Sequence, residues 1–178
     1  MPGTAVTSPF QDAILDKLQY QADSNDCGPY TTASVINALL DKGLDAAELA
    51  LEMDRPVWRG PQFVIRRVPH WATFPWGMVD VFHSYGLNAS WRPFTSLDNL
   101  WERLSGNYVL MPVQGGLKPL WAHVMALVKW DPNLGWGFAN TQFPYHHHTW
   151  IQDDLFRKQW QFTFRTVVEV EYSKEWIA

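Results

Sequence analysis

The sequence has little cysteine and no long apolar run. Cys27 is the only cysteine among 178 residues, so no disulfide can form within the chain, as is typical of proteins in a reducing compartment. No stretch approaches the roughly 18 consecutive apolar residues of a membrane-spanning helix. Residues 1–18 also lack the basic start and apolar run of a signal peptide. We therefore expect a cytoplasmic protein that has no membrane partner.

Positive charge is also scarce. The formal net charge is −4, and no run of Lys or Arg is longer than Arg66-Arg67. A protein that binds nucleic acid carries a basic patch or stripe, so we expect no nucleic-acid partner. The eleven tryptophans follow no fixed period, which argues against a repeat architecture. Nothing in the sequence indicates an oligomeric state.

Composition and periodicity indicate one globular α+β domain over residues 1–178. Hydrophobic residues make up 47% and charged residues 18% of the chain, and this length supports one substantial core. Residues 1–9 are small and polar, which predicts a loose tail. Helical spacing comes first and strand-like segments follow, which favours helices packed against an antiparallel sheet. Helices are expected at 10–19, 29–43, 45–53, 77–85, 96–104 and 151–160, and strands at 87–94, 107–113, 121–130, 135–140 and 165–172.

Cys27 lies at the expected start of a helix. Asp26 precedes it and Gly28 and Pro29 follow it, and proline is favoured in a first helical turn, where backbone N–H groups have no helical acceptor. Those N–H groups and the helix dipole stabilise a thiolate, so we expect this thiol to ionise below the free pKa of about 8.5. Gln21 lies six residues before Cys27. Its amide can donate to an oxyanion beside the attacking sulfur, together with the backbone N–H of Cys27.

A histidine and an asparagine lie at matching places on two later strands. His123 is near the start of the strand expected at 121–130, and Asn140 ends the strand expected at 135–140. A hairpin that turns at 131–135 brings both residues to the same end of adjacent strands. Asn140 can then hold the imidazole of His123, which a general base needs in order to fix its tautomer and direction.

The order of these residues resembles that of the papain-like cysteine peptidases. The pattern is most similar to the double-glycine (bacteriocin-processing) peptidase family and its stand-alone relatives, over about residues 18–172. The matching segments are Gln21, Asp26-Cys27-Gly28, His123-Val124-Met125-Ala126-Leu127-Val128 and Trp136-Gly137-Phe138-Ala139-Asn140. Double-glycine peptidases usually carry Asp where this chain has Asn140, whereas papain itself has Asn there.

The resemblance implies a papain-like α+β fold and a role for each of four residues. Cys27 is then the nucleophile, His123 the general base and acid, and Asn140 the residue that orients the imidazole. Gln21 is the oxyanion donor. This chemistry predicts a thiol hydrolase that cleaves a peptide or a small amide through an acyl-enzyme, with no cofactor and no metal.

Several alternatives use the same residues differently. An amine in place of water makes the enzyme an acyltransferase, and a non-catalytic module keeps the fold while the aromatic loop expected at 55–76 holds a ligand. Asp26 is expected to cap the cysteine helix. The run His146-His147-His148 attracts attention as a metal site, but successive residues do not converge easily on one ion. We therefore expect no metal there.

Overall fold

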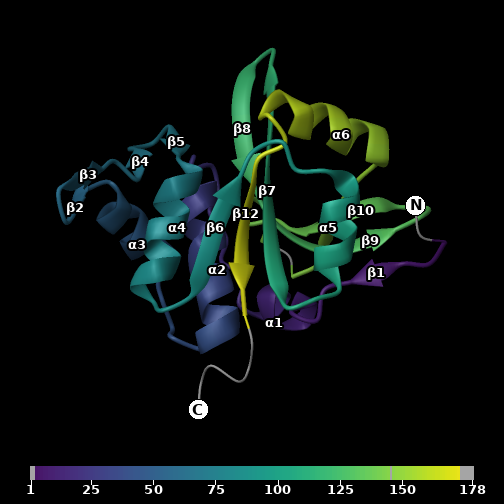
Figure 1. Cartoon of the computed structure of the whole chain (residues 1–178), viewed down its shortest axis with the longest axis horizontal. Coiled ribbons are helices and arrows are strands. Elements are labelled where there is room, and N and C mark those ends of the chain that lie inside the picture. The colour runs from purple at the N-terminus through teal and green to yellow at the C-terminus, as the bar shows by residue number, and fades with distance from the viewer. Residues whose placement is uncertain (1–2, 145, 173–178) are drawn as a thin grey trace.

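The computed structural model describes residues 3–144 and 146–172, and an eight-stranded sheet forms its centre (Figure 1). The strand order is β11-β10-β9-β7-β12-β6, with β1 paired to β9 and β8 paired to β7. Every pairing in this sheet is antiparallel. The strands are β1 (Val6–Thr7), β6 (Asn88–Arg92), β7 (Tyr108–Leu117), β8 (Leu120–Val124), β9 (Ala126–Asp131), β10 (Gly135–Ala139), β11 (His148–Ile151) and β12 (Val167–Glu171).

Helices cover the sheet on both sides. In Figure 1, α2 and α4 lie on one side of the sheet and α5 and α6 on the other. The predicted α+β class, with helices packed on an antiparallel sheet, is confirmed. The helices are α1 (Gln11–Asp16), α2 (Cys27–Leu40), α3 (Ala46–Met53), α4 (Pro75–Ser84), α5 (Leu97–Leu104) and α6 (Asp153–Phe162).

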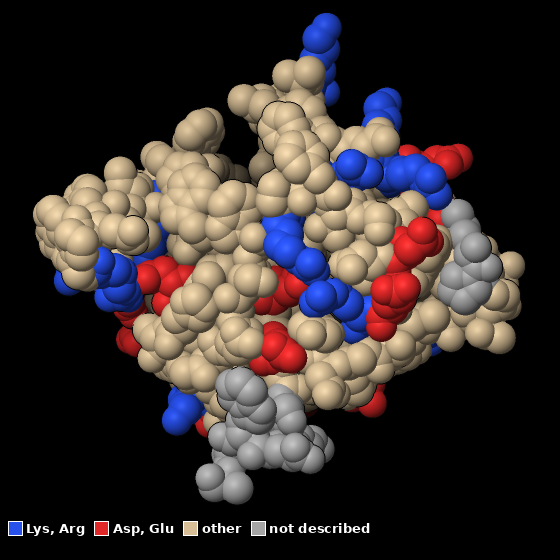
Figure 2. All heavy atoms as spheres, in the orientation of Figure 1, with Lys and Arg blue, Asp and Glu red and all other residues tan. Residues whose placement is uncertain are grey.

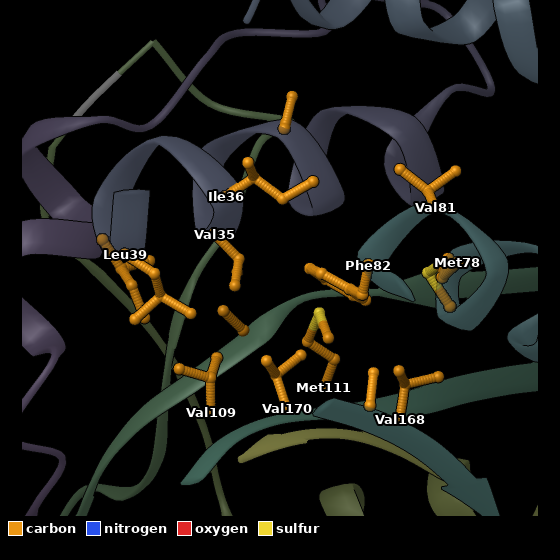
Figure 3. Packing of buried hydrophobic residues seen from close by; sticks show 14 of the residues in the cluster. Val35, Ile36, Leu39, Met78, Val81, Phe82, Val109, Met111, Val168 and Val170 are labelled. Carbon is orange, nitrogen blue, oxygen red and sulfur yellow. The ribbon is translucent and has the colours of Figure 1, made fainter. Parts of the chain in front are cut away.

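The strands have two buried faces because successive side chains point to opposite sides of a sheet. Along β7, Val109 and Met111 belong to the cluster beneath α2 and α4, whereas Leu110 belongs to the cluster beneath α5 and α6. This alternation explains why the strands read as continuous apolar runs rather than as amphipathic ones. Figure 3 shows the first cluster, in which side chains of the two helices meet those of β7 and β12: Val35, Ile36, Leu39, Met78, Val81, Phe82, Val109, Met111, Val168 and Val170.

Two of the predicted helix starts are confirmed by their capping bonds. The Asp45 carboxylate accepts a hydrogen bond of 2.9 Å from the Glu48 N–H at the start of α3. The Ser96 hydroxyl accepts one of 3.2 Å from the Asn99 N–H at the start of α5. The expectation for Asp26 was wrong, because its side chain makes no capping bond and pairs with Arg67 instead.

Three further segments differ from the expectations. Val6 and Thr7 pair with β9, so residues 6–7 are a strand rather than part of a loose tail, and residues 1–2 lie outside the described chain. The strand β11 was not predicted, since its sequence, HTWI, has no clear alternation. The segment expected as a loop at 55–76 contains two short hairpins and the start of α4. The hairpins are β2 (Val57–Arg59) with β3 (Gln62–Val64), and β4 (Arg67–Val68) with β5 (Ala72–Thr73).

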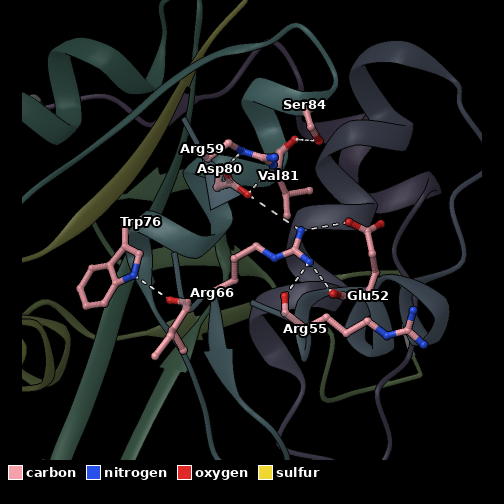
Figure 4. A network of polar contacts seen from close by, with 9 residues as sticks. Glu52, Arg55, Arg59, Arg66, Trp76, Asp80, Val81 and Ser84 are labelled. Carbon is pink, nitrogen blue, oxygen red and sulfur yellow. Dashed lines mark hydrogen bonds and ion pairs between the residues drawn. The ribbon is translucent and has the colours of Figure 1, made fainter. Parts of the chain in front are cut away.

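A polar network anchors these hairpins to α3 and α4 (Figure 4). The guanidinium of Arg66 forms an ion pair of 3.0 Å with Glu52 and donates a hydrogen bond of 3.1 Å to the Arg55 carbonyl. The indole N–H of Trp76 donates to the Ile65 carbonyl at 2.9 Å. Ile65 and Arg66 directly precede β4, and β5 packs against the first turn of α2.

Across the part of the chain that the structure describes, no helix is both long and apolar enough to span a membrane. Figure 2 shows acidic and basic side chains interspersed over the centre of one face, without a broad field of one sign.

Candidate active site

Cys27 is the first residue of α2 and is partly buried. The helix therefore begins two residues before Pro29, where the sequence predicted its start. The hydroxyl of Thr31 donates a hydrogen bond of 3.1 Å to the Val124 carbonyl, which ties the first turn of α2 to β8. Gly28 packs so closely on β5 that a Cβ atom there would lie 2.4 Å from the Cβ of Thr73. The thiol is thus held between a strand of the main sheet and a small hairpin.

His123 lies beside Cys27 and is oriented by Asn140. The ring nitrogen Nε2 of His123 is 2.9 Å from Oδ1 of Asn140, a residue that directly follows β10. The same Oδ1 accepts a hydrogen bond of 3.0 Å from the Gln142 N–H, which identifies it as the amide oxygen. Because an amide oxygen only accepts, Nε2 carries a hydrogen, and Nδ1 is left to face the sulfur. Cys27 and His123 line the same cleft, and hydrogen bonding and charge between the two side chains shift the pKa of each.

The thiol and the imidazole shift each other's protonation in opposite directions. Burial by itself raises the pKa of Cys27, but the hydrogen bond and charge of His123, with backbone hydrogen bonds from Val124 and Gly28, hold that pKa below its ordinary value. Burial by itself lowers the pKa of His123, but the Cys27 thiolate and then Asn140 outweigh this and raise it. Both shifts favour a thiolate paired with an imidazolium at neutral pH.

Gln21 is buried next to the thiol and is fixed at both ends of its amide. Its Nε2 donates a hydrogen bond of 2.7 Å to the Ser24 carbonyl, and its Oε1 accepts one of 2.5 Å from the Thr141 hydroxyl. Its backbone N–H also donates to the Thr141 carbonyl at 2.8 Å. An amide carries two N–H hydrogens, so one hydrogen of Gln21 has no acceptor among these bonds. That hydrogen is available to a ligand in the cleft.

Cys27, His123, Asn140 and Gln21 line one cleft of about 460 Å³. Trp71, which lies between β4 and β5, and Trp121 of β8 also line it. Figure 2 shows a hollow between the part that holds β4 and β5 and the projecting β7–β8 hairpin. The structure therefore brings together all four residues that the sequence singled out.

Three residues of this region had no signal in the sequence. Gln114 of β7 lines the cleft and is 1% exposed. Arg67 of β4 is also buried and pairs with Asp26, directly before the thiol. Trp71 belongs to the aromatic loop expected at 55–76, and nothing in the sequence distinguishes it from the other aromatic residues of that loop. Each of them reaches the site through a strand pairing or a turn that local sequence does not specify.

The histidine run lies against α1, away from the thiol. Nδ1 of His146 is 2.5 Å from the Leu15 carbonyl, and Nε2 of His148 is 2.9 Å from the Gln11 side-chain oxygen. Among residues 3–144 and 146–172, no three His, Cys, Asp or Glu side chains are grouped so that they could hold a metal ion.

Comparison with known proteins identifies the fold. No protein-family model and no curated protein matches the chain. A crystal structure from Bacillus anthracis, described as a C39-like peptidase, is similar with a TM-score of 0.69 and 10% identity, over 95% of this chain and 98% of that one. The peptidase domain of Streptococcus ComA, a bi-functional ABC transporter, is similar with a TM-score of 0.59 and 18% identity, over 88% of this chain and 98% of that one. The chain shares the papain-like fold of these C39 peptidases.

Proposed function

We propose that this protein is a thiol hydrolase that cleaves a peptide or amide bond. The observation that carries the proposal is the grouping of Cys27, His123 and Asn140 in one cleft, where His123 bonds to Asn140, the pKa of the thiol is lowered and that of the imidazole is raised. The fold shared with C39-like peptidases supports the same reaction class.

The first half of the reaction forms an acyl-enzyme. The Cys27 thiolate attacks the substrate carbonyl carbon, and the carbonyl oxygen takes up the negative charge. Cys27 begins α2, so its N–H has no helical acceptor, and it can bind this oxyanion together with the second amide hydrogen of Gln21. The imidazolium of His123 then gives its Nδ1 proton to the leaving amine as the carbon–nitrogen bond breaks.

The second half releases the acyl group. His123, now neutral, takes a proton from water, and the hydroxide attacks the thioester carbon. The carbon–sulfur bond breaks, and the thiolate and imidazolium form again. Asn140 keeps the hydrogen on Nε2 of His123 throughout, so that Nδ1 is the nitrogen that exchanges protons with sulfur and substrate. If an amine replaces water in this half, the same intermediate gives acyl transfer.

The rate at which iodoacetamide alkylates Cys27 between pH 4 and pH 10 tests the ion pair. An ordinary thiol is only about 0.3% thiolate at pH 6, whereas a thiol paired with imidazolium is largely ionised there. We expect labelling of the wild type at pH 6 to be at least about tenfold faster than labelling of His123→Ala. His83→Ala is the control, because His83 is exposed on α4 and its ring bonds to the Ala89 carbonyl, outside the cleft.

A single titration near pH 8.5 in all three proteins contradicts the proposed function. Cys27 is then an ordinary thiol, and a non-catalytic module that binds a ligand in the cleft becomes the better explanation. If the low-pH plateau is present, a screen of amide and thioester substrates, with water alone or with added amine, separates a hydrolase from an acyltransferase.

A further inference from the structure

Gln114 is a buried amide in the cleft with no partner for either of its polar atoms. It is 1% exposed, and among the described residues neither Nε2 nor Oε1 has a hydrogen-bond partner. Gln114 lies on β7 directly opposite His123 on β8. Directly opposed residues of an antiparallel pair point to the same face of the sheet. The Gln114 amide therefore stands beside the imidazole and lines the same cleft.

An amide buried in this way costs free energy unless something bonds to it. Gln21 provides the contrast, because it lines the same cleft and is 5% exposed, yet both ends of its amide have protein partners. Gln114 retains a free donor and a free acceptor side by side. That pair is complementary to a secondary amide, which offers one C=O and one N–H.

The strand around Gln114 holds this amide in place. A Cβ atom at Gly115, on the opposite face, would lie 2.7 Å from Phe162 of α6, so the helix packs directly on the backbone of β7. A Cβ atom at Gly116 would lie 2.6 Å from Nε1 of Trp121, so the indole lies close over this glycine. Trp121 and, from the β4–β5 turn, Trp71 line the cleft beside the amide.

We propose that Gln114 binds one amide unit of the substrate beside the scissile bond, donating from Nε2 to its C=O and accepting at Oε1 from its N–H. This inference rests on the proposed function and narrows its substrate class. The substrate is an extended peptide or another chain with a second amide near the scissile bond. A small ester, thioester or primary amide leaves the carboxamide of Gln114 unpaired.

Two alkylating probes that differ only in amide groups test this inference. Chloroacetone has a chloromethyl ketone and no amide, whereas N-acetyl-glycyl-glycine chloromethyl ketone adds backbone amides without side chains. With both probes the Cys27 sulfur forms a bond to the methylene carbon and chloride leaves. The rates are measured on the wild type, on Gln114→Met, which keeps the size but removes the amide, and on Gln161→Met, a control on the exposed face of α6.

We expect the peptide probe to alkylate the wild type and Gln161→Met faster than chloroacetone does. In Gln114→Met the ratio of these two rates should fall about tenfold, as the loss of two hydrogen bonds implies. The rate with chloroacetone should change by less than about twofold, because the thiolate and His123 are untouched. The unfolding temperature of Gln114→Met should be unchanged or higher, because the variant no longer buries an unpaired amide. If Gln114 had a purely structural role, its replacement would lower the unfolding temperature.

Three results overturn the inference. If Gln114→Met retains the full preference for the peptide probe, then a water molecule or nothing at all bonds to the Gln114 amide in the complex. If Gln114→Met is alkylated more slowly by both probes and also has a lower unfolding temperature, then Gln114 supports the fold. A wild type without any preference means that no amide unit is bound. Repeating the comparison at pH 9, where even an ordinary thiol is mostly ionised, keeps a missing probe preference separate from a failure of the low-pH ion pair.

Discussion

Arg67 is buried between two carboxylates beside the thiol, and its replacement should destabilise the protein strongly. Arg67 is 2% exposed, and its guanidinium bonds to Asp26 through Nη2 and forms an ion pair of 3.1 Å with Asp54 through Nε. The group thus contains one positive and two negative charges. Arg67→Met leaves two carboxylates with no counter-charge, whereas Asp26→Asn leaves a neutral ion pair between Arg67 and Asp54.

The difference between these two variants can be estimated. Removing one partner from a buried ion pair costs about 3–5 kcal/mol. The side chains of Asp26 and Asp54 are 16% and 22% exposed, so water can reach them in the variant, and we expect the lower end of that range. Asp26→Asn keeps an oxygen that can accept from Arg67, so we expect a loss of about 1 kcal/mol.

Urea unfolding followed by tryptophan fluorescence measures both losses. The control is Arg59→Met, because the Arg59–Asp80 pair has an arginine that is 46% exposed, and such pairs contribute about 0–1 kcal/mol. The reasoning is refuted if Arg67→Met loses no more free energy of unfolding than Arg59→Met, or if Asp26→Asn loses more than Arg67→Met. Either result means that the stability of the fold does not depend on the buried charge of Arg67.

Two other substitutions test the packing and the titration of the site. Gly77→Ala should cost about 2 kcal/mol or more, because a Cβ atom there would lie 2.1 Å from the backbone oxygen of Arg66 and the gain in helix propensity is only about 1 kcal/mol. Gly106→Ala, whose nearest contact would be 3.4 Å away, should change the free energy of unfolding by less than about 0.5 kcal/mol, and equal losses contradict the prediction. Asn140 raises the pKa of His123, so Asn140→Ala should lower that pKa and end the thiolate–imidazolium pair at a lower pH. An NMR titration of the His123 ring measures this, and an unchanged or higher pKa in the variant argues against the orienting role.

Local sequence signals located most of the helices and strands. The capping residues Asp45 and Ser96 start α3 and α5 as predicted, because a cap depends only on residues within one turn. The strand β1 was missed, since residues 6–7 are extended only through their pairing with β9. The hairpins of 55–76 were missed for a similar reason. Arg66 links this segment to Glu52 of α3 and Asp80 of α4, which both lie outside it.

The sequence by itself determined the setting of the thiol and the identity of its partners. A cysteine at a helix start, a glutamine six residues before it, and a histidine and an asparagine at matching ends of two strands are local patterns, and they predicted one cleft. Only the tertiary structure placed Gln114 in this cleft and paired Arg67 with Asp26, the residue before the thiol. Gln114 depends on the register of β7 with β8, and Arg67 depends on the packing of β4 against the start of α2. Register and packing are set by contacts between distant segments, so no local pattern can reveal them.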